Sequence, residues 1–301
     1  MKGVIYALLA MVSYSSTPTF TQVGYKGGIQ TNTLLFSRHV VSLICLFPTI
    51  FKKGTFESIG KKQIPGLLIL CAFSVIGNIS FNYAYHYLPN MVAVAITLSY
   101  VVFVFVLEIL LGRERFSPMR GLIIGLTGIG ILIIAIPGFS GAFSMTAFFV
   151  GLFSAFQYST QVVLMNSRAL KEVPTNVILL TGIIPIIIYS FIRCVLQHEA
   201  LLPSGGTQWF AIICLGTIGV IAARGLFYKS MRIIGATKAS MIDTLEPFSS
   251  AILGFVFLRQ SISIYTVTGS LLLMLSVVLL LREKSDKTEA SDNKDLQIKK
   301  K

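Results

Sequence analysis

The chain of 301 residues is divided into apolar runs of about twenty residues, and this pattern constrains its fold more than any other feature. A helix needs about 20 mostly apolar residues to cross the hydrocarbon core of a bilayer. Ten such runs are predicted, at roughly 3–23, 33–51, 64–87, 90–111, 120–136, 147–168, 177–196, 208–229, 235–258 and 264–281. Only 12% of the residues are charged, about half the share in an ordinary soluble domain. The sequence therefore predicts an all-α integral membrane protein with ten transmembrane helices.

The positive charges are distributed unevenly between the two sides that ten spans define. One side has both termini and the basic segments 52–62, 113–120, 168–171 and 229–238, whereas the other has only Lys26, Arg193 and Arg259. Loops rich in Lys and Arg remain in the cytoplasm. We therefore expect a multi-pass protein of the cell (cytoplasmic) membrane with both termini in the cytoplasm. The net charge of +13 has the same explanation, and no nucleic-acid partner is expected, because no basic face with interleaved aromatic residues occurs.

The second half of the sequence repeats the first. The stretch "GVIYALLAMVSYSS" near the start is echoed by "GLFSAFQYSTQVV" from residue 151, and "VVFVFVLEILLGRERFS" (101–117) is echoed by "PFSSAILGFVFLRQSIS" (247–263). An odd number of spans in each copy turns the second copy upside down in the bilayer. We expect a first five-helix repeat over 1–140, an inverted five-helix repeat over 141–282, and a disordered basic cytoplasmic tail over 283–301.

Three motifs connect the chain to a known family. The L-E-P pattern at Leu245–Pro247, the "LLGRERFS" turn and the arginine of "LLFSRH" resemble the drug/metabolite transporter (DMT) superfamily, and more narrowly its EamA-type ten-span members. The resemblance covers Gly3 to Arg282. The turn departs from the family's usual L-G-E because Arg113 precedes Glu114, and the second copy reads "LRQ". The resemblance implies a two-fold-related bundle around a central substrate cavity that works by alternating access.

Two carboxylates and a proline lie in the middle of the ninth run. Asp243 and Glu246 are three residues apart and share a helix face, and Pro247 removes one backbone donor and frees a carbonyl near Asp243. A carboxylate beside unwound backbone can bind a cation, a proton or an ammonium group. We interpret the segment as a gated polar site. The alternative is that Asp243 lies near the cytoplasmic end and that Glu246 only pairs with Arg224.

Arg38 and Arg224 are the cations inside the second and eighth runs. Arginine binds carboxylate or phosphate with two parallel hydrogen bonds, so either residue could hold a substrate carboxylate. The preferred interpretation is structural, with each arginine neutralising a fixed acid. Glu108 lies one turn from the end of its run, where its side chain can reach the membrane surface.

Two polar stripes follow helical spacing. Asn78, Asn82 and Tyr85 lie on one face of the third run, and Gln157 and Gln161 lie on one face of the sixth. Such residues either line a substrate cavity or form hydrogen bonds between helices. Because the family resemblance puts both spans around the cavity, the two interpretations stay open at about equal weight.

Two further features concern helix shape and association. Pro18 follows a hydroxyl-rich stretch in the first run and predicts a second helix break. The spacing Gly121-x-x-x-Gly125 in the fifth run permits close helix packing, preferably within the monomer, or alternatively in a homodimer.

The leading functional hypothesis is a secondary transporter of a small polar metabolite, such as an amino acid or a related zwitterion or amine, with export as the expected direction. Proton coupling at Asp243 or Glu246 and passive exchange stay open. The alternatives are an importer or exchanger of a nucleotide, a nucleotide-sugar or a cation such as choline, and a non-transporting scaffold. The expected partners are the lipid bilayer and a small-molecule substrate. No metal, cofactor or enzymatic activity is expected, because the sequence lacks a nucleotide-binding motif and a zinc-type histidine pattern.

Overall fold

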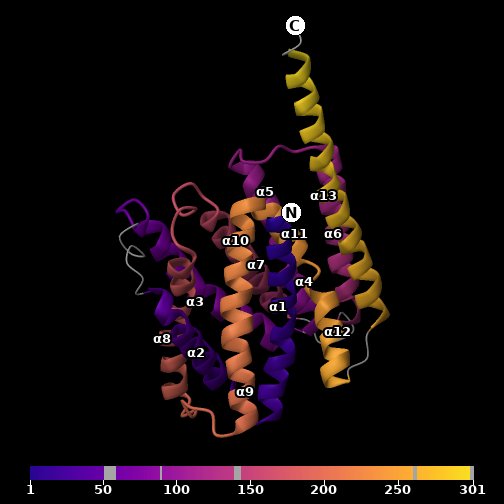
Figure 1. The fold of residues 1–301 in the computed structure, drawn as a ribbon. Helices are drawn as coiled ribbons and strands as arrows, with labels where there is room; N and C mark the ends of the chain where they lie inside the picture. The colour runs from indigo at the N-terminus through magenta and orange to yellow at the C-terminus, as the bar shows by residue number, and fades with distance from the viewer. Residues whose placement is uncertain (51–58, 89, 139–143, 260–262, 299–301) are drawn as a thin grey trace.

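The computed structural model describes residues 1–50, 59–88, 90–138, 144–259 and 263–298. Within these ranges the chain forms helices and connecting turns and contains no strand (Figure 1). The elements are α1 (Lys2–Lys26), α2 (Thr31–Ile50), α3 (Ile64–Tyr87), α4 (Asn90–Leu98), α5 (Tyr100–Leu110), α6 (Pro118–Ala135), η1 (Ile136–Gly138), α7 (Met145–Met165), α8 (Thr175–Leu196), α9 (Gly206–Cys214), η2 (Leu215–Ala222), α10 (Ala223–Ile234), α11 (Ala236–Asp243), α12 (Glu246–Leu258) and α13 (Ile264–Ile298).

Eight helical segments in the described part of the chain are long and apolar enough to cross a bilayer. They are α2, α3, the joined α4–α5, α6, α7, α8, the joined α9–η2–α10 and the first part of α13. Helix α1 has 25 residues but a hydroxyl-rich second half, and α11 and α12 are short, with 8 and 13 residues. The prediction of an all-α membrane protein is confirmed, and the count of ten spans stays a prediction.

Helices from the two halves of the sequence are packed against each other. Helix α1 contacts α10, α11 and α12, and in the same way α7 contacts α3, α4 and α5, while α2 packs on α8 and α6 on α13. The start of α1 and the end of α13 lie at the same end of the bundle (Figure 1). At that end, the Ser230 hydroxyl on α10 donates to the Gly3 carbonyl at 2.8 Å.

Helices α6 and α13 approach each other closely at a pair of glycines, Gly130 and Gly269, that lie outside the Gly121-x-x-x-Gly125 spacing. A Cβ on Gly269 would lie 2.7 Å from the carbonyl oxygen of Gly130, so only glycine permits this contact. By contrast, a Cβ on Gly125 would meet no atom within 4 Å, and one on Gly121 would meet only Phe116. The preferred prediction that Gly121 and Gly125 pack within the monomer is therefore wrong, because α6 turns a different face toward α13.

Two of the membrane helices are broken near their middle, and the breaks occupy equivalent positions in the two halves. Helix α4 ends at Leu98 and α5 begins at Tyr100, while α11 ends at Asp243 and α12 begins at Glu246. The sequence alignment that pairs Val101 with Pro247 also pairs Tyr100 with Glu246. Interrupted helices inside a bundle leave backbone groups free to face a substrate or a partner helix.

The break predicted at Pro18 is absent, because α1 continues through this residue. The proline removes one N–H, the normal partner of the Tyr14 carbonyl, but transmembrane helices tolerate this loss when hydroxyl groups and neighbouring helices surround it. Here the hydroxyls of Ser15 and Ser16 donate back to the carbonyls of Met11 and Ser13 at 2.8 and 2.7 Å.

An eight-residue π-helix, η2, lies opposite this part of α1. A Cβ on Gly219 would lie 2.9 Å from Thr17 Oγ1, and one on Gly216 would lie 2.7 Å from the Arg38 carbonyl oxygen. The Ser42 hydroxyl also donates to the Gly216 carbonyl at 2.9 Å. The widened helix is thus in direct contact with α1 and α2, and it ends two residues before Arg224. π-Turns are rare and occur mostly at functional sites.

Helix α13 begins at Ile264 and ends at Ile298. The disordered basic tail over 283–301 stays a prediction.

Candidate functional site

The two broken helices meet at Asp243. This residue ends α11, is 5% exposed, and its Oδ2 accepts a hydrogen bond of 2.8 Å from the hydroxyl of Tyr100, the first residue of α5. The other oxygen, Oδ1, is buried and has no hydrogen-bond partner among the described residues. The ring of Tyr158 on α7 packs edge-on against Tyr100, with centroids 4.8 Å apart. A half-satisfied carboxylate therefore lies among tyrosines in the interior of the bundle.

Glu246 lies just across the same break. It is the first residue of α12, and Pro247 is the second, a position where helices tolerate proline because the missing N–H would have no partner. The hydroxyl of Ser15 on α1 donates to the Glu246 carbonyl at 3.2 Å. The side chain is half-buried, and its charge is close enough to interact with that of Asp243. The break thus places two acidic groups side by side.

The ion pairs of the structure lie elsewhere. Among described residues, Arg113 pairs with Glu108 at 3.3 Å and Arg120 pairs with Glu114 at 2.7 Å. The alternative in which Glu246 pairs with Arg224 is therefore wrong. So is the preferred interpretation of the embedded arginines: within the described chain neither Arg38 nor Arg224 forms an ion pair with an acid, and α2, which carries Arg38, packs on α8 and η2.

The two arginines form a cationic group of their own. A guanidinium nitrogen of Arg224 (Nη1) lies over Gly182 of α8, where an added Cβ would be only 2.9 Å away. Arg38 on α2 is close enough to interact with the charge of Arg224, and its Nε is buried without a hydrogen-bond partner in the described structure. Two positive charges inside a membrane bundle repel each other unless an anion joins them.

Tyrosines connect the acidic and basic groups. Tyr14 and Tyr158 both interact electrostatically with Arg224 and with Asp243. We call Tyr14, Tyr100, Tyr158 and Tyr228 the tyrosine cluster. The sequence analysis did not select Tyr100 or Tyr228. The available signals were the alignment of Tyr100 with Glu246 in the repeat, and the i, i+4 spacing of Tyr228 from Arg224.

The stripe on α3 divides into two parts. The side-chain amide of Asn82 donates to the carbonyl and to Oδ1 of Asn78 at 2.8 and 2.9 Å, so the two asparagines bond to each other. Tyr85 packs on Phe81, with ring centroids 4.3 Å apart, and lies close enough to Glu246 for an electrostatic interaction. Of this stripe, Tyr85 is the residue that the structure brings to the acidic pair.

The stripe on α7 contains a helix-to-helix link. Gln157 is 2% exposed, and its side-chain amide donates to the Phe73 carbonyl of α3 at 2.6 Å. This contact is the interhelical hydrogen bond that was the alternative to a cavity role. Gln161, one turn later, is half-buried.

These features define a multi-pass, all-α membrane protein in which interrupted helices hold charged side chains inside the bundle. The chain belongs to the EamA-like transporter family, whose pattern matches residues 1–136 and again residues 139–282. It is therefore a transporter, and the resemblance to the drug/metabolite transporter superfamily is confirmed.

Two relatives agree with this assignment, and one solved structure shares the fold. An uncharacterized transporter of Archaeoglobus fulgidus is 24% identical over 277 residues, which cover 88% of this chain and 94% of the relative. The uncharacterized inner membrane transporter YicL of Salmonella typhimurium is 35% identical over 75 residues, 25% of each chain. A protein of known crystal structure has the same fold, with a TM-score of 0.73 at 15% identity over 92% of this chain and 96% of the other.

Proposed function

We propose that the protein is a secondary transporter that exports a small zwitterion or amine, such as an amino acid, across the cytoplasmic membrane. The observation that carries this proposal is the separation of opposite charges. Asp243 and Glu246 lie on α11 and α12, Arg38 and Arg224 lie on α2 and α10, and no ion pair joins the two groups in the described structure.

Energetics favour a ligand that bridges these groups. A charge near the bilayer centre costs at least about 2.5–3.5 kcal/mol on insertion scales, so uncompensated charges need a functional reason. The amine of a zwitterion would bind the acidic pair, and its carboxylate would bind the arginines through bidentate hydrogen bonds. The tyrosine cluster interacts with both groups and would supply hydroxyl groups and ring faces to the part of the ligand between them.

Alternating access is supported by the paired helix breaks and by the packing. We propose that residues 1–140 and 141–282 are inverted repeats that rock about the site, with both termini in the cytoplasm. The equivalent contacts of α1 and α7, and the breaks before Tyr100 and Glu246, are what two symmetry-related repeats produce. The uneven distribution of Lys and Arg supports the orientation.

The test uses ligands that carry one or both charges. Purified protein is heated with each amino acid, with its methyl ester, which lacks the carboxylate, and with its des-amino acid, which lacks the amine. Counterflow in liposomes is then measured for every ligand that raises the melting temperature. Stabilisation and flux that require both charges support the proposal. Preference for a permanent cation such as choline or for a nucleotide-sugar would replace it, and no flux of any compound would indicate a scaffold.

A further inference from the structure

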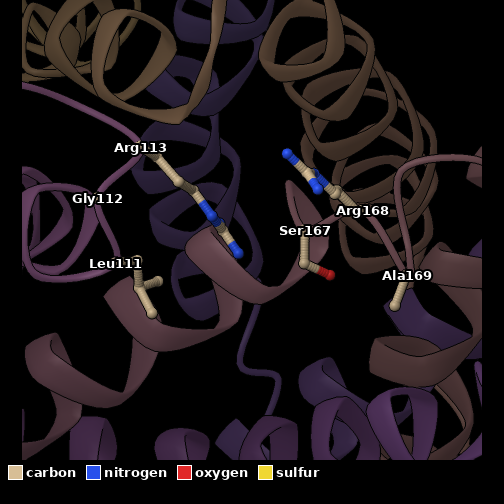
Figure 2. Close-up of a pocket in the computed structure, with 6 residues that line it drawn as sticks. All are labelled: Leu111, Gly112, Arg113, Ser167, Arg168 and Ala169. Carbon is tan, nitrogen blue, oxygen red and sulfur yellow. The ribbon is translucent and has the colours of Figure 1, made fainter.

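A second site lies away from the central charges, at the end of the bundle that holds the N-terminus. A cavity of about 750 Å³ is lined by Leu111, Gly112, Arg113, Ser167, Arg168 and Ala169. Its walls are the turn after α5 and the turn after α7, and Arg113 and Arg168 extend from opposite sides of it (Figure 2). The site therefore joins the two halves of the chain at the level where membrane helices end.

A second cavity adjoins the first. It measures about 670 Å³, shares Arg168 and Ala169 with its neighbour, and adds Lys61 and Lys62 from the turn before α3. Four basic side chains thus line the two neighbouring cavities. Basic residues are common on the cytoplasmic side of membrane proteins even where no ligand binds. A binding site is indicated by how these basic side chains are positioned and by which of them have partners within the protein.

The position of Arg113 is fixed by the helix end before it. Gly112 has φ +67, and the N–H of Arg113 donates to the Glu108 carbonyl at 2.9 Å, which turns the chain back toward α7. From this position Arg113 Nη1 donates to the Val163 carbonyl at 3.0 Å and to Glu108 Oε1 at 3.3 Å. Among the described residues only Nη1 of this guanidinium has hydrogen-bond partners, so the other two nitrogens can donate to a ligand.

Arg168 forms no hydrogen bond or ion pair with the described residues, although Glu172 follows four residues later. Neither Lys61 nor Lys62 has an ion-pair partner in the described part of the chain. An exposed cationic wall opposite a fixed arginine suits a phosphate group, which arginine binds with paired hydrogen bonds.

Exposed leucines lie at the α5 edge of the cavity. Leu111 lines the cavity and is 54% exposed, and Leu110 beside it is 75% exposed. In a membrane bundle such exposed leucines contact acyl chains. A ligand that fills the space therefore has an anionic head against Arg113 and Arg168 and an apolar tail along Leu110 and Leu111.

We propose that this pocket binds the phosphate headgroup of an anionic phospholipid from the leaflet at the N-terminal end of α1. Arg113 and Arg168 clamp the phosphate from the two halves of the protein, Lys61 and Lys62 neutralise the outer part of the headgroup, and the acyl chains lie on Leu110 and Leu111. Basic pockets between membrane helices bind anionic headgroups by the same chemistry. Because the clamp connects α5 with α7, the lipid stabilises the contact between the halves.

The experiment measures the melting temperature of the full-length protein in detergent with added phosphatidylglycerol, phosphatidylcholine or soluble glycerol phosphate. Phosphatidylglycerol should stabilise the wild type more than phosphatidylcholine does. Arg168→Gln should weaken the apparent affinity for phosphatidylglycerol by about tenfold, which corresponds to about 1.4 kcal/mol. Lys171→Gln is the matched control, because Lys171 carries the same charge in the same turn but lines neither cavity.

The outcomes separate a site from a general attraction between positive charge and anionic lipid. Loss of the lipid effect in Arg168→Gln and its retention in Lys171→Gln support the site. Equal losses in both variants would overturn the proposal, and so would equal stabilisation by glycerol phosphate, which would make the ligand a soluble phosphate. Unchanged melting of Arg168→Gln without lipid would show that the substitution leaves the fold intact. The central site lies outside this test, so failure here leaves the proposed function unaffected.

Discussion

The hydroxyl of Tyr100 donates to Asp243 Oδ2 at 2.8 Å, and this bond joins the broken helix of the first half to the broken helix of the second. Tyr100 begins α5 and Asp243 ends α11, so both partners lie at helix interruptions. A bond between two interruptions can open with little loss of helical hydrogen bonding.

Replacing Tyr100 with Phe should lower stability, because it leaves a buried carboxylate oxygen without a donor. The expected cost is about 1–3 kcal/mol, measured as a loss of melting temperature. The matched change is Asp243→Asn. If the bond is direct, the double variant should cost less than the sum of the two single changes. Strict additivity would show that Tyr100 and Asp243 act independently.

Glu246→Gln keeps the shape of the side chain but removes its negative charge. If Glu246 binds the substrate amine, counterflow and gradient-driven accumulation should fall together, and binding should weaken by about 1.5–3 kcal/mol. Flux assays and ligand-induced thermal shifts measure the two effects. Loss of accumulation with normal counterflow would instead make Glu246 a proton carrier.

The same variant also tests the separation of Glu246 from Arg224. Because no ion pair joins them, the stability changes of Glu246→Gln and Arg224→Gln should add within about 0.3–0.5 kcal/mol. A strong recovery of melting temperature in the double variant would be evidence for a pair that the structure does not show.

Two glycine-to-alanine changes should impair different properties, one of them substrate binding and the other stability. A Cβ at Gly182 would lie 2.9 Å from the flexible end of Arg224 and at an ordinary 3.7 Å from Ser74 Oγ, so Gly182→Ala should retain stability yet displace the guanidinium and weaken substrate binding. A Cβ at Gly216 would meet the backbone oxygen of Arg38 at 2.7 Å, and Gly216→Ala should cost about 1–3 kcal/mol of stability. Melting curves and binding assays on both variants distinguish the cases. Normal binding in Gly182→Ala would remove Arg224 from the proposed substrate site.

The orientation is tested by cysteine labelling in intact cells, with the four native cysteines replaced. A cysteine at Ser204, in the turn between α8 and α9, should react with an impermeant reagent from outside, and one at Lys62 should not. The reverse pattern would invert the proposed topology and would place the lipid pocket in the outer leaflet.

The sequence predicted the fold best where one type of residue has a single strong physical effect. Runs of apolar residues predicted the membrane helices, and the acidic pair next to Pro247 directed attention to the segment that is broken in the structure. The break between Leu98 and Tyr100 has no proline or glycine to mark it, and Pro18 does not interrupt α1. Such outcomes depend on neighbouring helices, which the local sequence does not specify.

Polar residues were harder to interpret for the same reason. The i, i+4 spacing gave Gln157 and Gln161 the same two interpretations, yet in the structure the Gln157 amide donates to the Phe73 carbonyl. Tyr100 contributes to the site through its contact with Asp243, which lies 143 residues away in the chain. Periodicity gives the face of a helix on which a side chain lies, but the partner on that face comes from tertiary packing.

The π-helix η2 sets the register of α10. A π-turn holds more residues per turn than an α-turn, since its hydrogen bonds join residues five apart instead of four. Tightening η2 to α geometry would rotate everything after it about the helix axis, and Arg224 follows η2 by two residues. The guanidinium of Arg224 would then leave its place over Gly182, so the winding of η2 sets where this positive charge lies in the bundle.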